Sequence, residues 1–121
     1  TPSWMICARQ ADMDSGEKEV VFTKEVASVF QEKEQYLLIK ADKLSYNLEK
    51  DRVIVEGSPV LLVDKNRHVQ LAASTIHMWR TEKGELIFQG IGAVKIALAP
   101  EEEVVLEKAC EELLQTMPKG E

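Results

Sequence analysis

The stretch ADKLSYNLEKDRVIVEGSPV, residues 41–60, sets the fold that we expect for this chain. Two runs of alternating apolar residues, the first ending at Tyr46 and the second beginning at Val53, flank a polar turn. Such alternation is typical of β-strands that bury one face. Gly57 then marks a bend in the backbone, after which Val60 begins another apolar run. The basic unit is therefore a long strand, a turn, a shorter strand, a bend and a further strand.

The same unit occurs three times along the chain. The copy before the central one lies 33 residues upstream, and the copy after it lies 32 residues downstream, or 33 after one inserted turn residue. Three sets of positions correspond: Ala8, Ala41 and Ala73; Met13, Tyr46 and Met78; Lys24, Gly57 and Gly90. One unit alone cannot bury its apolar face, so stacked units build a continuous core. The small alanines would allow close approach where the sheet folds over.

Residues 1–98 consist of short β-rich runs separated by polar or glycine-bearing breaks. No long helical period interrupts them, which favours an antiparallel meander over parallel strands joined by helices. The predicted strands are Trp4–Met13, Glu19–Phe22, Val26–Gln31, Tyr36–Tyr46, Arg52–Glu56, Val60–Val63, His68–Trp79, Glu85–Gln89 and Ala93–Leu98.

Residues 99–121 have a different pattern and form the second predicted unit, an acidic amphipathic helix and tail. Pro100 suits a first helical position, and Glu101–Glu103 would lie in the first turn, where the helix dipole favours negative charge. One apolar face follows i, i+3, i+4 spacing: Leu106, Ala109, Cys110, Leu113, Leu114 and Met117. The sequence therefore predicts a helix over residues 100–117 that is ended by Pro118.

Composition and charge narrow the functional classes. The 121 residues are 45% hydrophobic and carry a net charge of −6. Residues 101–121 hold seven acids and two bases, whereas the remaining 100 residues hold 14 acids and 13 bases. Neither part is basic, which argues against nucleic-acid binding. No apolar run is long enough to span a membrane, and we expect that a leader or membrane anchor is missing from a chain that does not begin with Met.

The residues that usually carry chemistry do not form a recognisable site. Cys7 and Cys110 are 103 positions apart; they are compatible with one disulfide, but two buried free thiols are the favoured interpretation. His68 and His77 are nine apart, which places them on opposite faces of a regular strand and disfavours a metal pair. The chain has no phosphate-binding loop, nucleophile elbow or His/Cys pairing. We therefore expect no catalytic residues, no metal, no cofactor and no enzymatic activity.

The pattern Ala-Asp-x-Leu-x-Tyr followed by Val-x-Val-x-Gly-x-x-Val in residues 41–60 resembles the OstA-like repeat of the lipopolysaccharide transport family. That group includes LptA-like and LptC-like domains. The resemblance covers about residues 4–96 in three copies. The third copy has Ser74 where the central copy has an Asp, and the first copy lacks the glycine.

The resemblance implies a β-jellyroll, a V-shaped stack of two antiparallel sheets, followed here by the C-terminal helix. It implies a periplasmic protein that binds lipopolysaccharide and carries its acyl chains in an apolar groove from the inner to the outer membrane. Other bridge proteins of this transport system would join end to end by strand addition. LptC-like members carry an inner-membrane anchor. The alternatives are a β-stack that binds another lipid and a protein–protein scaffold.

Aliphatic side chains on one face of the strands would line such a groove, because each buried methylene contributes about 0.8 kcal/mol to acyl-chain binding. Ordinary core packing is the alternative role for each of them. The candidate groove residues are Phe22, Ile39, Ala41, Leu44, Val53, Val55, Leu71, Ala73, Ile76, Met78, Leu86, Phe88, Val94 and Ile96.

The C-terminal helix departs from the family pattern. We expect it to cap an open end of the stack, away from the groove mouth, because its negative charge would repel an anionic head group. Covering the groove and docking on a partner are the alternatives.

Overall fold

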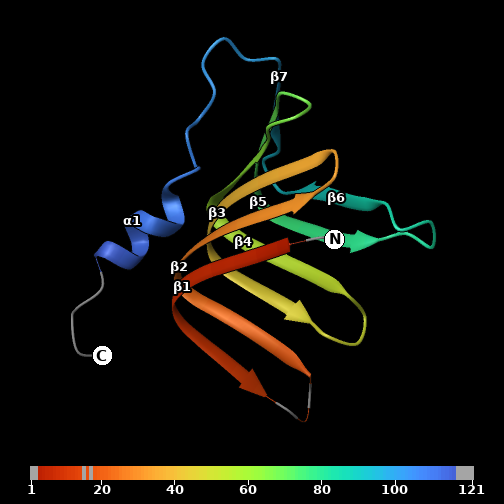
Figure 1. Cartoon of the computed structure of the whole chain (residues 1–121), viewed down its shortest axis with the longest axis vertical. Helices are drawn as coiled ribbons and strands as arrows, with labels where there is room; N and C mark the ends of the chain where they lie inside the picture. Colours follow the sequence, from red (N-terminus) through yellow and green to blue (C-terminus); the bar gives the residue numbers. More distant parts are fainter. Residues whose placement is uncertain (1–2, 15, 17, 117–121) are drawn as a thin grey trace.

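The computed structural model describes residues 3–14, 16 and 18–116, and its described part is mostly β-structure with one short helix (Figure 1). The elements are β1 (Ser3–Asp14), β2 (Glu19–Glu32), β3 (Gln35–Asn47), β4 (Arg52–Asp64), β5 (Val69–Arg80), β6 (Leu86–Ile91), β7 (Lys95–Leu98) and α1 (Ala109–Gln115). All strand pairs are antiparallel, and β1 to β6 follow one another in sheet order, while β7 also pairs with β5. The all-β class and the antiparallel meander are confirmed.

The strands form a single sheet that is creased along a line of register shifts. The shifts lie between Ala8 and Gln10, Thr23 and Val26, Lys40 and Lys43, and Glu56 and Val60. Bulges of this kind bend a strand and increase its twist. The crease divides the sheet into a first half, with residues 3–8, 26–32, 35–41, 60–64, 69–73 and β7, and a second half, with residues 10–14, 19–23, 43–47, 52–56, 75–80 and β6.

Two of the strands run through positions where the sequence predicted breaks. β2 and β4 each continue across the crease, so the breaks at residues 23–25 and 57–59 are bulges and not turns. Lys24 has a φ of 60°, and the equivalent Gly57 lies so close to the next residues that an added Cβ would be 2.9 Å from the backbone nitrogen of Val60. Gly90, the third equivalent, is the second-last residue of β6. The repeated position therefore marks where each strand pair bends or ends.

The repeated alanines lie along the inner side of the crease. Ala8 is opposite Val26, which is in turn opposite Ala41, and Ala73 is opposite Val60. Directly opposed residues in antiparallel strands share a face. The repeated alanine is therefore small because the sheet folds over itself along this row.

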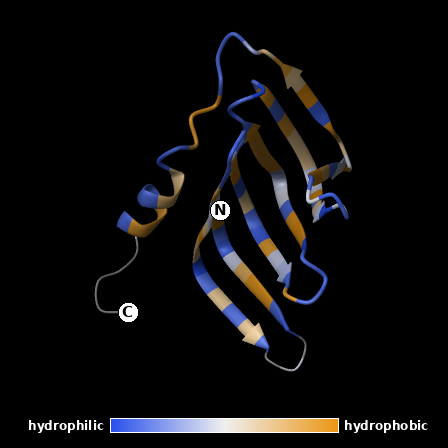
Figure 2. Cartoon of the chain, turned by 45° about the vertical axis from the view of Figure 1, so that its right-hand side comes forward, coloured by the Kyte–Doolittle hydropathy of each residue, from blue (hydrophilic) through white to orange (hydrophobic). Residues whose placement is uncertain are grey.

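The main core lies inside the fold, between the two halves. Fourteen buried residues from β2 to β5 form this interior cluster, and both halves contribute to it. The outer face of the first half is also apolar, since Val29, Leu38 and Val63 are buried or partly buried there. Figure 2 shows how hydrophobic residues recur along the strands.

The C-terminal segment, residues 99–116, runs over the outside of the sheet and is called the strap below (Figures 1 and 2). Its helix covers only Ala109–Gln115, so the predicted helical conformation of residues 100–108 and the placement of Glu101–Glu103 in a first turn are wrong. Those residues extend along the sheet because Glu103 and Leu106 contact it. The predicted helix end at Met117 and Pro118 lies outside the described residues.

The helix lies at one end of the strand order but does not cap it. α1 packs on the outer face of β1 and β2, because Cys110 contacts Cys7 and Ala27. This face is opposite the interior cluster, so the helix does not cover the interior. The expected cap over the end of the sheet is therefore replaced by a contact with its outer face.

Candidate functional site

The candidate groove residues fall into three groups. Nine are buried together in the interior cluster: Ile39, Ala41, Leu44, Val53, Val55, Leu71, Ala73, Ile76 and Met78. Phe22, Leu86 and Phe88 are partly buried and pack against the same cluster. Val94 and Ile96 differ from the rest because they are 46% and 58% exposed near the β7 edge. The structure thus brings twelve of the fourteen residues together around the crease.

Several interior residues were not among those predicted. Val60 and Leu62 follow the β4 bulge, which shifts the inward-facing positions from the odd-numbered residues before it to even-numbered residues after it. Leu37 continues the alternation of Ile39 and Ala41 along β3, so the sequence did contain its signal. The further additions to the cluster are Val26 and Phe30, with Trp4, Ala8 and Tyr46 packed against it.

An open apolar depression lies at one margin of the fold. A cavity of about 320 Å³ is lined by Trp4 and Ile6 from the first half and by Val20, Phe22, Tyr46 and Leu48 from the second half and the turn after it. This volume is within the range of small-ligand pockets. We call this opening the interior mouth. Four of its lining residues, Trp4, Ile6, Phe22 and Tyr46, pack against the interior cluster.

Aromatic rings connect the two halves at the interior mouth. Trp4 lies edge-to-face with its cross-strand neighbour Phe30, with ring centroids 5.5 Å apart, and with Tyr46 at 5.7 Å. The indole nitrogen of Trp4 donates a hydrogen bond to the hydroxyl of Ser28. The polar ends of these rings are therefore satisfied while their faces remain available to apolar neighbours.

Charged side chains join the same two halves. The guanidinium of Arg80 lies 5.6 Å from the Phe30 ring centroid, 3.1 Å from Glu32 Oε2 and 3.7 Å from Asp51 Oδ2. Glu32 belongs to the first half, while Asp51 lies in the turn that ends the second half. The Tyr46 hydroxyl donates to Asp51 Oδ1 at 2.7 Å, and this bond, with burial, raises the pKa of Tyr46 to about 12. Arg80 thus bridges the margin of the interior.

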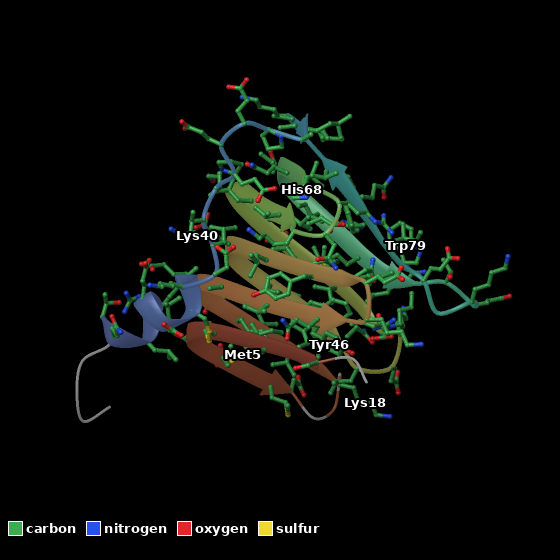
Figure 3. All side chains as sticks on the ribbon, turned by 45° about the horizontal axis from the view of Figure 1, so that its top comes forward. Met5, Lys18, Lys40, Tyr46, His68 and Trp79 are labelled. Carbon is green, nitrogen blue, oxygen red and sulfur yellow. A yellow bond between two sulfur atoms is a disulfide. The ribbon has the colours of Figure 1, made fainter. Side chains whose placement is uncertain are left out.

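An ionic cluster fastens the strap to the sheet. Lys65 Nζ lies 2.8 Å from Glu107 Oε1 and 3.3 Å from Glu103 Oε2, and His68 Nδ1 lies 3.0 Å from Glu103 Oε1. Hydrogen bonds from His68 and Lys65 lower the pKa of Glu103, and the bond from Lys65 lowers the pKa of Glu107. Both carboxylates raise the pKa of Lys65, Glu107 most strongly. Figure 3 labels His68 near the strap.

A disulfide fixes the far end of the strap. Cys7 in β1 and Cys110 in α1 are bonded, with Cα atoms 5.5 Å apart, and Figure 3 shows the bond between helix and sheet. The interpretation that favoured two free thiols is therefore wrong. Cys7 faces outward between the inward-facing Ile6 and Ala8, and the strap then carries Cys110 across to it.

No three His, Cys, Asp or Glu side chains converge on a metal-binding position within residues 3–14, 16 and 18–116. Over the same residues, no helix has the length and apolar character needed to cross a membrane. No family model and no curated protein matches the chain.

Proposed function

We propose that this chain is a periplasmic lipid-handling domain of a lipopolysaccharide transport system, a β-jellyroll of the OstA-like type. It holds acyl chains between the two halves of its folded sheet and passes them along a bridge of similar domains. It performs no catalysis, and its work is to bind and transfer.

The observation that supports this proposal is the large apolar cluster between the two halves, with the apolar depression of the interior mouth lying against it. Aliphatic residues from β2 to β5 form most of the cluster, and Trp4 and Phe22 line the mouth itself. Transfer of an acyl chain from water into such surroundings is favourable in proportion to the apolar area removed from water. In this proposal an acyl chain first contacts the depression of about 320 Å³, and the halves part to admit it.

The edges of the sheet support assembly into a bridge. Within the described residues, β1 pairs only with β2, and β6 and β7 pair only with β5. Each end of the sheet therefore offers backbone groups to an added strand. The helix of the strap packs on the outer face of β1 and β2. A disulfide also agrees with an oxidising compartment such as the periplasm.

Photo-crosslinking tests the proposal. A benzophenone amino acid replaces Phe22 or Phe88, which are partly buried aromatic positions that tolerate its size. The matched control is Ile54, which is 41% exposed and points away from the interior that its neighbours Val53 and Val55 face. The purified variants are illuminated with lipopolysaccharide micelles or with phosphatidylglycerol micelles.

Adducts of lipopolysaccharide at Phe22 and Phe88, with none at Ile54, would support the proposal. Adducts of phosphatidylglycerol alone would overturn the choice of lipid and favour a carrier of another lipid. Absence of any lipid adduct at both interior positions would overturn lipid handling and favour a protein–protein scaffold.

A further inference from the structure

The strap has little stability of its own. Its helix α1 has seven residues, and no side chain caps its N-terminus. Helices of that length are not stable in isolation. Only Leu106, Cys110 and Leu113 of the strap are buried. Polar bonds also hold it: those to Lys65 and His68 near its middle, one from Gln70 to the Glu102 carbonyl, one from the Ala99 amide to the His68 carbonyl, and the 2.6 Å bond from Arg9 Nη2 to Thr116 Oγ1 at its end.

The sheet, in contrast, does not depend on the strap. The fourteen residues of the interior cluster all belong to β2, β3, β4 and β5. The strap contributes instead to two small clusters on the outer face, one around Cys7 and one around Leu38 and Val63. Loss of the strap contacts therefore leaves the hydrogen-bonded strands and the interior packing in place.

The disulfide between Cys7 and Cys110 is the one covalent link between the strap and the body of the sheet that the described residues show beyond the continuous chain. A cleft of about 310 Å³ lies beside it, between α1 and β1 and β2. Ala27 and Ala109 line this cleft, and both also pack against the two cysteines. Neither cysteine lines the cleft, so a small thiol would reach the bond from this side only once α1 moves away from Ala27.

We propose that the Cys7–Cys110 disulfide is a redox lock that holds the strap on the outer face of the sheet. A dithiol reductant opens it by attack of one thiolate on a cysteine sulfur, which gives a mixed disulfide and releases the other cysteine as a thiol. The second thiol of the reductant then closes its own disulfide ring. Two electrons and two protons pass in total from the reductant to Cys7 and Cys110.

Once the lock is open, the strap leaves the sheet. Ordering the strap backbone costs more conformational entropy than burial of Leu106, Cys110 and Leu113 offsets, and its ion pairs are partly exposed and therefore weak. Release uncovers an apolar stripe on the first half, which includes Ala27, Leu38 and Val63. This inference does not depend on the proposed function.

Hydrogen–deuterium exchange of the whole chain, oxidised and then reduced with dithiothreitol, tests the lock. The reporters are two amides of the strap: Glu112, bonded to the Lys108 carbonyl at 2.9 Å, and Thr116, bonded to the Glu112 carbonyl. We expect these amides to exchange about tenfold faster or more after reduction, while the amides of β3 and β4 keep their protection.

Two matched proteins separate the lock from other effects of the reductant. In Cys7→Ser/Cys110→Ser the strap amides should exchange fast without reductant and should not respond to it. In the wild-type chain whose two sulfurs are joined by a methylene bridge, which dithiothreitol does not cleave, the strap amides should stay protected. Strap amides that remain protected after reduction would show that the sheet contacts alone hold the strap. Equal loss of protection in β3 and β4 would show that the disulfide holds the whole fold. Either result would overturn the proposal.

Discussion

The ring of Trp4 lies edge-to-face against the ring of Tyr46, with centroids 5.7 Å apart, although the two residues belong to opposite halves of the creased sheet. This contact closes part of the interior mouth. It also shows that the two halves are held together by side chains at their free margin as well as by the backbone at the crease.

The Trp4 contact should be measurable in the stability of the fold. Trp4→Ala removes its edge-to-face contacts with Phe30 and Tyr46, and we expect it to lower the free energy of unfolding by about 2–4 kcal/mol. The control is Met5→Ala, because Met5 is the next residue of β1 and is 53% exposed; its effect should stay within about 0.5 kcal/mol. Urea denaturation measures both. Equal effects of the two substitutions would contradict the assigned contact.

Tyr46 should ionise at unusually high pH. Its folded-state pKa of about 12 lies above the ordinary value of 10.0, mainly because its hydroxyl donates to Asp51. The protonated phenol therefore contributes stability that is fully present below about pH 10 and is lost as the pH rises towards 12. Phenolate absorbance during a pH titration of the wild type and of Asp51→Asn measures the shift. The Asp51→Asn titration should move back towards 10, and an unchanged titration would contradict this cause.

Gly57 should not accept a side chain. In Gly57→Ala the new Cβ would lie 2.9 Å from the backbone nitrogen of Val60, so the β4 bulge must shift, and we expect a loss of about 1–3 kcal/mol. Gly84→Ala is the comparison: Gly84 has a φ of 82° but nothing within 4 Å, so only the conformational cost of about 1 kcal/mol applies. Thermal unfolding of both variants measures the difference. A smaller loss for Gly57→Ala than for Gly84→Ala would refute the crowding argument.

Acid should loosen the middle of the strap. The pKa values of Glu103 and Glu107 are lowered in the folded state, so the stabilisation they supply is present above their ordinary value of 4.5 and is lost as the pH falls through the lowered values. The amide signals of the strap in NMR spectra should therefore shift in this acidic range. Lys65→Met should weaken that response, whereas Lys50→Met, in the turn between β3 and β4, should leave it unchanged. Identical titrations of the wild type, Lys65→Met and Lys50→Met would show that the ion pairs of Lys65 do not hold the strap on the sheet.

Arg80 should control access to the interior. Arg80→Met removes its bonds to Glu32 and Asp51 across the margin. Partly exposed ion pairs contribute about 1 kcal/mol or less, so the open population should rise by at most about fivefold. If lipid enters at the interior mouth, the yield of lipopolysaccharide adduct at Phe22 should rise accordingly. Arg52→Met, an exposed position on β4, is the control. A lower adduct yield in Arg80→Met would show that Arg80 binds the lipid instead of restraining the halves.

Much of the sheet could be predicted from local pattern. The alternation around Leu44 and Val55 identified interior positions correctly, because their burial follows from the period of a strand. Val60 and Leu62 were not among the predicted groove residues because Gly57 was interpreted as a bend between two separate strands. In the structure residues 57–59 form a bulge within β4. A bulge adds a residue to one strand, so the residues that face inward change from odd to even positions after it.

The C-terminal segment could not be predicted in the same way, because its conformation depends on distant residues. Pro100 and the glutamates after it favour the start of a helix, but Glu103 instead binds Lys65 and His68. Leu106 packs on the sheet instead of on a helical neighbour. No local pattern connects Cys7 with Cys110 either. Their proximity results from the sheet and from the path of the strap around it.

The strap makes the two halves mechanically unequal. The strap covers the outer face of the first half, and this second layer stiffens the first half against bending. The outer face of the second half has no such layer among the described residues, and Ile54 there is 41% exposed. If the fold widens, the second half should therefore rotate about the crease while the first half, which the strap covers, stays in place.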